Sequence, residues 1–232
     1  MDACASLEFT GHTSSGDAGL YARIDSLIIA GWTGRDEAAM QAHIAELEAI
    51  GIARPKSTPI FYRVAAALLT TADEIEVPGE ESSGEVETVL LSLPDGLWVG
   101  VGSDHTERKI EAVNVTASKQ MCAKPIGREL WPYGEVKDHW DRLVLRSFAT
   151  VGGKRRLYQE GEAATMRPPG ELMGLYTGNE AGLPPGSAMF GGTLAVIGGI
   201  APADSFEIEL HDPVLDRTIG HSYEIRTLPV KG

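Results

Sequence analysis

Two glutamates one residue apart are the first candidates for chemistry. Glu85 and Glu87 flank a single valine and precede the apolar run at 89–91. Side chains alternate between the two faces of a β-strand, so both carboxylates would lie on the same face. Like charges placed side by side repel unless a cation relieves them. Oxygen ligands suit Mg²⁺ or Mn²⁺, although a solvated strand face would carry the same spacing without an ion.

A third carboxylate, Asp104, follows the next strand. The stretch 85–92, the Pro-Asp-Gly turn at 94–96 and the returning stretch 97–101 form a hairpin pattern. If this hairpin forms, its return brings Asp104 back beside the two glutamates. Three carboxylates brought together from separate segments are explained more simply by a divalent-metal site than by chance spacing.

Four further residues are candidates for binding or catalysis. Lys119 lies among small and apolar residues and could polarise a carbonyl or hold an enolate, or could simply bury its stem. His105, next to Asp104, is a candidate ligand or base, although a lone loop histidine is more often neither. Gly192 and Thr193 follow another glycine beside an apolar strand, which would let a ligand approach the backbone or would form a plain turn.

Composition excludes several classes of protein. The 232 residues include 33 acidic and 20 basic ones, for a net charge of −13, which opposes nucleic-acid binding. Cys4 and Cys122 are the only cysteines, so neither a disulfide framework nor a thiolate zinc site is expected. The sequence has no signal-like start and no apolar stretch of about 20 residues, so no membrane partner is expected and the prediction is a cytoplasmic protein. Dinucleotide, P-loop and serine-elbow motifs are missing.

The remaining pattern predicts a mainly β protein with some helix, of the α+β class. One helix is predicted at 35–49, capped by Thr33, and the stretch at 62–70 is interpreted as a helix-like packing segment. Strands are predicted at 7–9 and 24–30, and further hairpins pair 143–150 with 156–158 and 206–210 with 223–227. The predicted organisation is an N-terminal part, 1–58, that packs on a core, 59–232.

The order of these motifs resembles that of the fumarylacetoacetate hydrolase superfamily. The resemblance covers roughly 59–228 and is closest to the bacterial DUF2848 branch. The motifs that carry it are Glu85-Val86-Glu87, Asp104 with Arg108, Lys119, Gln159-Glu160-Gly161-Glu162 with Met166, and Gly192-Thr193.

The resemblance implies a mixed β-sandwich roll, a homodimer and a small-molecule oxo acid as substrate. It implies that Mg²⁺, or Mn²⁺, is held by Glu85, Glu87 and Asp104. It implies catalytic roles for Lys119, which would stabilise an oxyanion, and Arg108, which would order the site. Substrate binding is assigned to Gly192, Thr193 and His105.

Two departures from the family pattern leave the reaction open. The gap from Glu87 to Asp104 is short, and the only N-terminal candidate for the base that activates water is His12, near Glu8. The first prediction is a metal-dependent hydrolase that cleaves a C–C bond of an acylpyruvate-like acid through a metal-stabilised enolate. The alternatives are an oxo-acid decarboxylase, hydratase or isomerase on the same site, and a non-catalytic protein that binds a small ligand.

Overall fold

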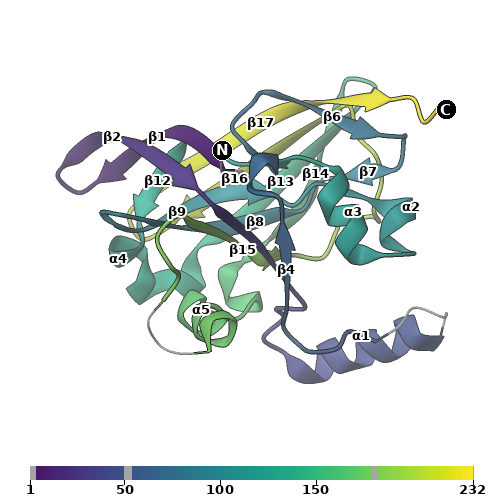
Figure 1. The fold of residues 1–232 in the computed structure, drawn as a ribbon, viewed down its shortest axis with the longest axis horizontal. Coiled ribbons are helices and arrows are strands. Elements are labelled where there is room, and N and C mark those ends of the chain that lie inside the picture. Colours follow the sequence, from purple (N-terminus) through teal and green to yellow (C-terminus); the bar gives the residue numbers. More distant parts are fainter. Residues whose placement is uncertain (1–3, 50–53, 179–181, 232) are drawn as a thin grey trace.

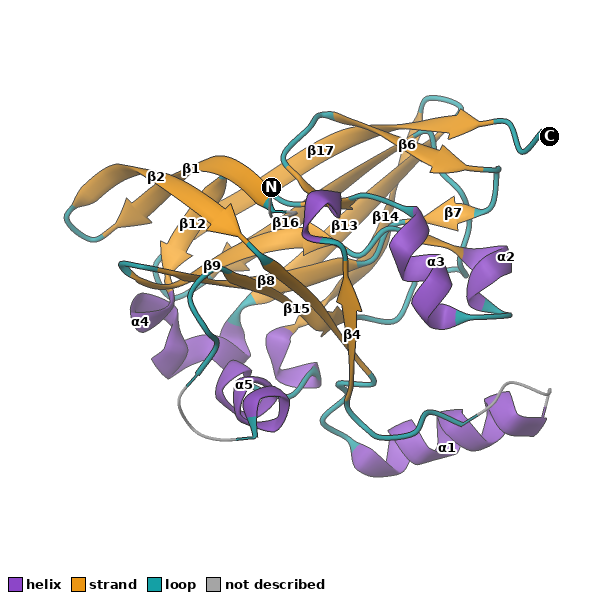
Figure 2. Cartoon of the chain, in the orientation of Figure 1, coloured by secondary structure: helices purple, strands orange, loops and turns teal. Residues whose placement is uncertain are grey.

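Two large β-sheets dominate the computed structural model, which describes residues 4–49, 54–178 and 182–231. Short helices lie at the margins of the sheets, and one longer helix projects from the body of the molecule (Figure 1). Strands account for most of the regular structure (Figure 2). The predicted class, mainly β with some helix, is confirmed.

The larger sheet has eight strands in the order β2-β1-β12-β9-β8-β15-β3-β4. Its strands are β1 (Ala5–Thr13), β2 (Gly16–Ile24), β3 (Ser26–Gly31), β4 (Ile60–Val64), β8 (Val86–Leu93), β9 (Gly96–Ser103), β12 (Glu129–Pro132) and β15 (Ser187–Thr193). The central strand β8 is antiparallel to both of its neighbours, β9 and β15. This position buries every residue of β8.

The second sheet has five strands in the order β14-β13-β16-β17-β6. They are β6 (Glu74–Pro78), β13 (Val144–Val151), β14 (Lys154–Glu162), β16 (Ser205–Asp212) and β17 (Arg217–Leu228). Two short pairs complete the strands, β5 (Leu69–Thr70) with β11 (Lys124–Pro125) and β7 (Ser82–Ser83) with β10 (Thr106–Glu107).

The helical segments are short apart from the first. They are α1 (Glu37–Ala49), η1 (Ala66–Leu68), α2 (Arg108–Glu111), α3 (Val115–Met121), α4 (Tyr133–Val136), η2 (Lys137–Arg142), η3 (Ala163–Thr165) and α5 (Pro169–Thr177). Helix α3 contacts α2, β10 and β4. Within the part of the chain that the structure describes, none of the helices combines the length and apolar character required to cross a bilayer.

The hydrophobic core divides into two clusters, one on each face of β8. Val86 and Leu90 belong to the cluster shared with the five-stranded sheet, whereas Val89 and Leu91 belong to the other. Glu87 follows the same alternation as Val89 and Leu91, which places its carboxylate on the second face. A carboxylate is thus held inside a sheet whose neighbouring positions are apolar.

Three predicted hairpins form, one of them in a shifted register, two other local predictions need correction, and one strand was not predicted. The predicted hairpins are β8–β9, β13–β14 and β16–β17. In the last of these, 206–210 pairs with 219–223 and not with 223–227, whereas 224–228 pairs with β6. The stretch 62–70, predicted to be helix-like, instead forms the end of β4, a single 3₁₀ turn and β5, because β4 pairs with β3. Asp36, not Thr33, accepts the hydrogen bond from Ala39 N at 3.0 Å that caps α1. The stretch 16–24 is a strand that the sequence interpretation missed.

The N-terminal segment shares the large sheet with the core. β3 lies between β15 and β4, and β1 pairs with β12 in parallel. The predicted boundary at residue 58 falls between α1 and β4.

Candidate metal centre and catalytic site

Three carboxylates converge where β8 begins and β9 ends. Val86 pairs with Ser103 in this hairpin, and Asp104 N donates to Glu85 O over 3.0 Å. One oxygen each from Glu85, Glu87 and Asp104 lies within 4.8 Å of the others. The tight turn predicted from the sequence therefore brings these three side chains together.

The oxygen spacing fits a hard divalent ion. Two oxygens that bind one ion at ~2.0–2.6 Å can lie no more than ~4.0–5.2 Å apart, and the three carboxylate oxygens lie within 4.8 Å of one another. Among the described residues, no donor makes an aligned hydrogen bond to the buried Asp104 Oδ1. Carboxylate oxygens suit Mg²⁺ or Mn²⁺, so these three residues would hold such an ion.

Two lysines approach Asp104 from different elements. Lys119, from α3, hydrogen-bonds through Nζ to Asp104 Oδ2 and lies 3.9 Å from Glu85 Oε2. Its Nζ is also 5.7 Å from the centre of the Tyr62 ring. Lys124, from β11, lies 3.0 Å from Asp104 Oδ1 and is fully buried. Sequence reasoning singled out Lys119 but missed Lys124.

Arg108 holds the outer glutamate in place. Its Nη1 donates to Glu85 Oε1 at 2.9 Å and to Glu111 Oε2 at 2.7 Å, and its Nε donates to Ser83 Oγ at 2.8 Å. Burial would lower the pKa of Arg108, but the charges of Glu85 and Glu111 outweigh burial and raise it. The guanidinium therefore stays charged and holds Glu85 through the bond from Nη1.

Burial and charge separate the pKa values of the carboxylates. Burial, followed by the charges of Asp104 and Glu85, raises the pKa of Glu87 well above its usual range. Burial would also raise the pKa of Asp104, but the charges of Lys119 and Lys124 outweigh it and lower the pKa to about 2. The pKa of Lys119 is raised because Asp104 and Glu85 outweigh its burial. Asp104 is the fixed negative charge of the cluster.

Glu87 is hydrogen-bonded to Gly192, one of the residues that the sequence singled out. Gly192 N donates to Glu87 Oε2 over 2.7 Å. Thr193 Oγ1 donates to Val86 O over 2.8 Å and accepts from Gln159 Nε2 over 2.8 Å. The two residues assigned to substrate binding thus lie beside the carboxylates and are engaged by the protein. Their assignment to the substrate stays a prediction.

A sequence model of the family described as "Protein of unknown function (DUF2848)" matches residues 30–223. The chain belongs to the DUF2848 family. No curated protein sequence matches it.

Solved structures of fumarylacetoacetate hydrolase family proteins have a fold similar to that of this DUF2848 protein. Yeast ynq8, a fumarylacetoacetate hydrolase family protein, is 19% identical with a TM-score of 0.63, over 90% of this chain and 95% of that one. A putative fumarylpyruvate hydrolase from Burkholderia cenocepacia is 18% identical with a TM-score of 0.61, over 97% of each chain. A 2-keto-3-deoxy-D-arabinonate dehydratase complexed with magnesium and 2,5-dioxopentanoate is 15% identical with a TM-score of 0.61, over 88% of this chain and 73% of that one.

His105 of this family member is buried next to Asp104, where it hydrogen-bonds to the side chains of Tyr223 and Ser82. Tyr223 Oη donates its single hydrogen to Ser103 Oγ at 2.8 Å, and it therefore accepts from His105 Nδ1 at 3.0 Å. A neutral ring that donates through Nδ1 accepts through Nε2, here from Ser82 Oγ at 3.0 Å. Burial, with the charges of Lys124 and Arg108, lowers the pKa of His105 to about 3. The imidazole is neutral and both nitrogens have partners. A role for His105 toward substrate stays a prediction.

The structure places His12 away from the carboxylates. Its ring bonds Asp17 at 2.7 Å and Glu129 at 2.9 Å. It lies beside the β1–β2 turn, at the opposite end of the molecule from α3 (Figure 1). The N-terminal base candidate is therefore not brought to this site.

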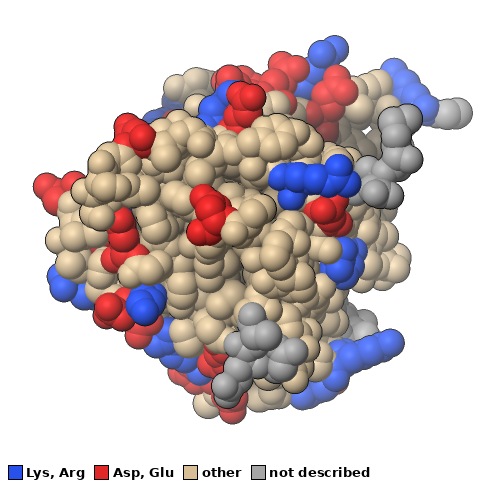
Figure 3. Space-filling model, turned by 60° about the vertical axis from the view of Figure 1, so that its left-hand side comes forward, with Lys and Arg blue, Asp and Glu red and all other residues tan. Residues whose placement is uncertain are grey.

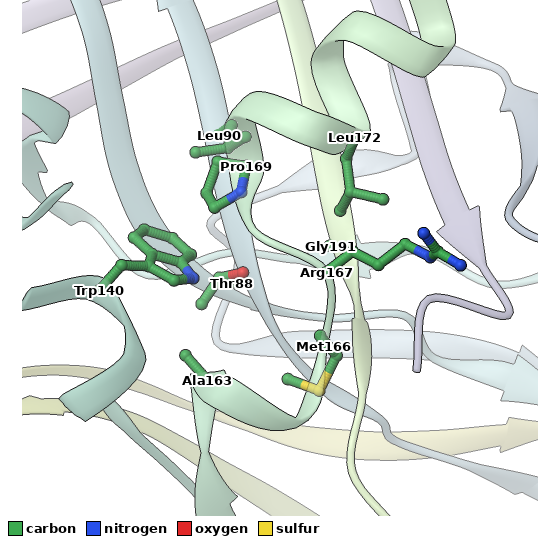
Figure 4. Close-up of a pocket in the computed structure, with 9 residues that line it drawn as sticks. All are labelled: Thr88, Leu90, Trp140, Ala163, Met166, Arg167, Pro169, Leu172 and Gly191. Carbon is green, nitrogen blue, oxygen red and sulfur yellow. The ribbon is translucent and has the colours of Figure 1, made fainter. Parts of the chain in front are cut away.

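A small cavity lies on the other face of β8. Thr88 and Leu90 of β8 and Gly191 of β15 line it, together with Trp140 and Met166 (Figure 4). Its volume is about 10 Å³, close to the ~10–15 Å³ that one water molecule needs. The cavity is too small for an oxo acid.

On the face shown in Figure 3, acidic and basic side chains are scattered among uncharged ones.

Proposed function

We propose that the protein is a divalent-metal-dependent hydrolase that cleaves a C–C bond of an acylpyruvate-like or other 2-oxo acid. The observation that carries this proposal is the convergence of Glu85, Glu87 and Asp104 oxygens within 4.8 Å beside the buried ammonium of Lys119. The relative that holds magnesium and 2,5-dioxopentanoate supports the same pairing of ion and oxo compound.

The proposed chemistry divides between the ion and the side chains. When bound, Mg²⁺ or Mn²⁺ supplies a Lewis acid that polarises the oxo group of the substrate. Lys119 stabilises the negative charge that develops on the substrate oxygen as the C–C bond breaks, because a preorganised buried cation is most effective there. Arg108 keeps Glu85 oriented, and Gly192 N–H does the same for Glu87. Thr193 is proposed to contact the substrate carboxylate after exchanging its bond to Val86 O.

A second candidate is an oxo-acid decarboxylase, hydratase or isomerase on the same site. The neutral His105 has both nitrogens engaged by Tyr223 and Ser82, so it offers no free base for a hydrolytic water. Reactions that need only enolate formation do not require such a base. The dehydratase among the structural relatives supports this alternative. A non-catalytic small-ligand-binding role is the third candidate.

Calorimetric titration of chelator-stripped protein with Mg²⁺ and Mn²⁺ tests the metal site. Glu87→Gln removes one ligand while keeping the size of the side chain, and Glu224→Gln is the matched control at an exposed position of β17. We expect binding to the wild type and to Glu224→Gln, and its loss in Glu87→Gln. Wild-type protein that is folded yet binds neither ion would overturn the metal-dependent function.

A panel of 2-oxo and 2,4-dioxo acids in D₂O, with metal present, separates the candidate reactions. Hydrolytic cleavage produces two carboxylic or oxo-acid fragments. Deuterium incorporation next to the oxo group without hydrolytic cleavage would favour the second candidate. Binding without cleavage or exchange would favour the third.

Sedimentation of the same preparation tests the homodimer that the family resemblance predicts.

A further inference from the structure

Lys124 places a third cation inside the carboxylate cluster. Its side chain is completely buried, and its Nζ donates to the carbonyl oxygen of His105 over 2.6 Å. The same Nζ lies 3.0 Å from Asp104 Oδ1, the oxygen that has no aligned hydrogen-bond donor. A buried ammonium is costly unless an opposite charge lies beside it, so this lysine is held there by Asp104.

The position of Lys124 does not depend on the helix that supplies Lys119. Lys124 pairs with Leu69 in the parallel β5–β11 bridge, whereas Lys119 is carried by α3. The two ammonium groups approach different oxygens of Asp104. Asp104 is therefore compensated from both sides before any ion is considered.

The carboxylates already have cations beside them without a metal. Arg108, Lys119 and Lys124 lie against Glu85 and Asp104, and Arg108 also pairs with Glu111. A divalent ion on these carboxylates would add two positive charges where three cations already lie. Of the three cations, Lys124 is the one that faces Asp104 Oδ1.

We propose that Lys124 is a built-in counter-cation that stabilises the metal-free carboxylate cluster and, by repulsion, weakens its affinity for a divalent ion. The inference rests on the proposed metal site and concerns its strength. Two like charges close together in a buried site repel strongly, because little water screens them. The same charge stabilises Asp104 when no ion is bound. Removing the charge of Lys124 should thus affect the metal-free and metal-bound proteins in opposite directions.

Two variants of Lys124 separate charge from hydrogen bonding. Lys124→Met removes both the charge and the donor, and Lys124→Gln removes the charge but keeps a donor for the His105 carbonyl. Lys154→Met, at an exposed position of β14, makes the same change in net charge and is the control. The readouts are Mn²⁺ affinity by calorimetry and the thermal midpoint of the chelator-treated protein.

We expect both Lys124 variants to bind Mn²⁺ at least tenfold more tightly than the wild type and to melt at a lower temperature without metal. Lys154→Met should match the wild type in both respects. If Lys124→Met is too unstable to handle without metal, Lys124→Gln supplies the comparison. Binding by a Lys124 variant that equals or falls below that of the wild type would overturn the inference and leave the proposed metal site standing.

The remaining outcomes also distinguish the two proposals. Tight Mn²⁺ binding by a Lys124 variant, with none by the wild type, would support the inference in its strongest form and count against a metal-dependent wild-type enzyme. No binding by either protein would overturn both.

Discussion

The backbone N–H of Gly192 donates to Glu87 Oε2 over 2.7 Å and so ties β15 to the carboxylate face of β8. Gly192 has φ of +96°, and a Cβ at this position would lie 1.8 Å from Thr33 Oγ1. A side chain is therefore excluded by both the backbone conformation and the close approach of Thr33. Gly192, which the sequence singled out, therefore brings a backbone donor against the buried carboxylate of Glu87.

Gly192→Ala should destabilise the protein by about 2 kcal/mol or more, because the variant combines a strained φ with a clash against Thr33. It should also weaken metal binding, since Glu87 loses its fixed donor. Urea unfolding and Mn²⁺ calorimetry measure the two effects. Gly170→Ala is the control, because a Cβ at Gly170 meets no atom within 4 Å. Equal stability of the two variants would contradict the prediction.

Gln159→Leu should lower the free energy of unfolding by roughly 2–4 kcal/mol. The buried Gln159 amide accepts from Val86 N at 3.0 Å and donates to Thr193 Oγ1 at 2.8 Å and Leu194 O at 2.7 Å. Leucine has a similar size but leaves these polar groups without their partner. Gln120→Leu also removes two bonds to backbone atoms, but from an exposed side chain, and should cost less than about 1 kcal/mol. Urea unfolding of both variants provides the comparison, and equal losses would count against the prediction.

Lys119→Met should reduce kcat on the active oxo acid by roughly 10²-fold or more, because a preorganised cation is lost where negative charge develops. Metal binding should survive, since the three carboxylates remain. Lys109→Met, an exposed lysine on the neighbouring α2, is the matched control. Steady-state kinetics and Mn²⁺ calorimetry together check the prediction. A variant that keeps wild-type kcat would remove Lys119 from the catalytic groups.

Protonation of His221 should destabilise the fold at acid pH. His221 Nε2 donates to Ala72 O at 3.1 Å, and burial lowers the pKa of this histidine. The unfolded chain therefore binds the proton more readily than the folded one. The contribution of neutral His221 to the free energy of unfolding is complete above the unfolded-state pKa of about 6.5 and is lost as the pH falls below that value.

Urea unfolding of chelator-treated protein at about pH 7.5 and about pH 5.5, on either side of the unfolded histidine pKa, measures this effect. Wild-type protein should lose more stability between the two conditions than His221→Gln, which has no titrating ring. Identical losses in the two proteins would show that His221 does not contribute.

The carboxylate cluster could be predicted because its geometry is local. The alternation of Glu85 and Glu87 and the Pro-Asp-Gly turn at 94–96 together determine where Asp104 returns. Period-two alternation and turn chemistry depend on neighbouring residues, which a single sequence displays. The same local signals predicted the β13–β14 and β16–β17 hairpins.

Other predictions failed because they depend on distant partners. The stretch 62–70 has an apolar run that suits a helix or a strand, and pairing with β3 selected β4. Thr33 has a capping side chain, yet it is buried against Gly192, and Asp36 caps α1 instead. In both cases tertiary packing outweighed local preference.

By itself, the sequence was sufficient to predict the class of fold, the family resemblance and the three carboxylates, because strand alternation, turn residues and the order of motifs can be read along the chain. It also identified Arg108 and Lys119, whereas only the tertiary structure placed Lys124 beside the carboxylates. Lys124 follows Asp104 by 20 residues, with two helices between them, and reaches Oδ1 because the parallel bridge of β11 with β5 places it there. Contacts of this kind arise from chain crossing and burial, which residue spacing does not specify.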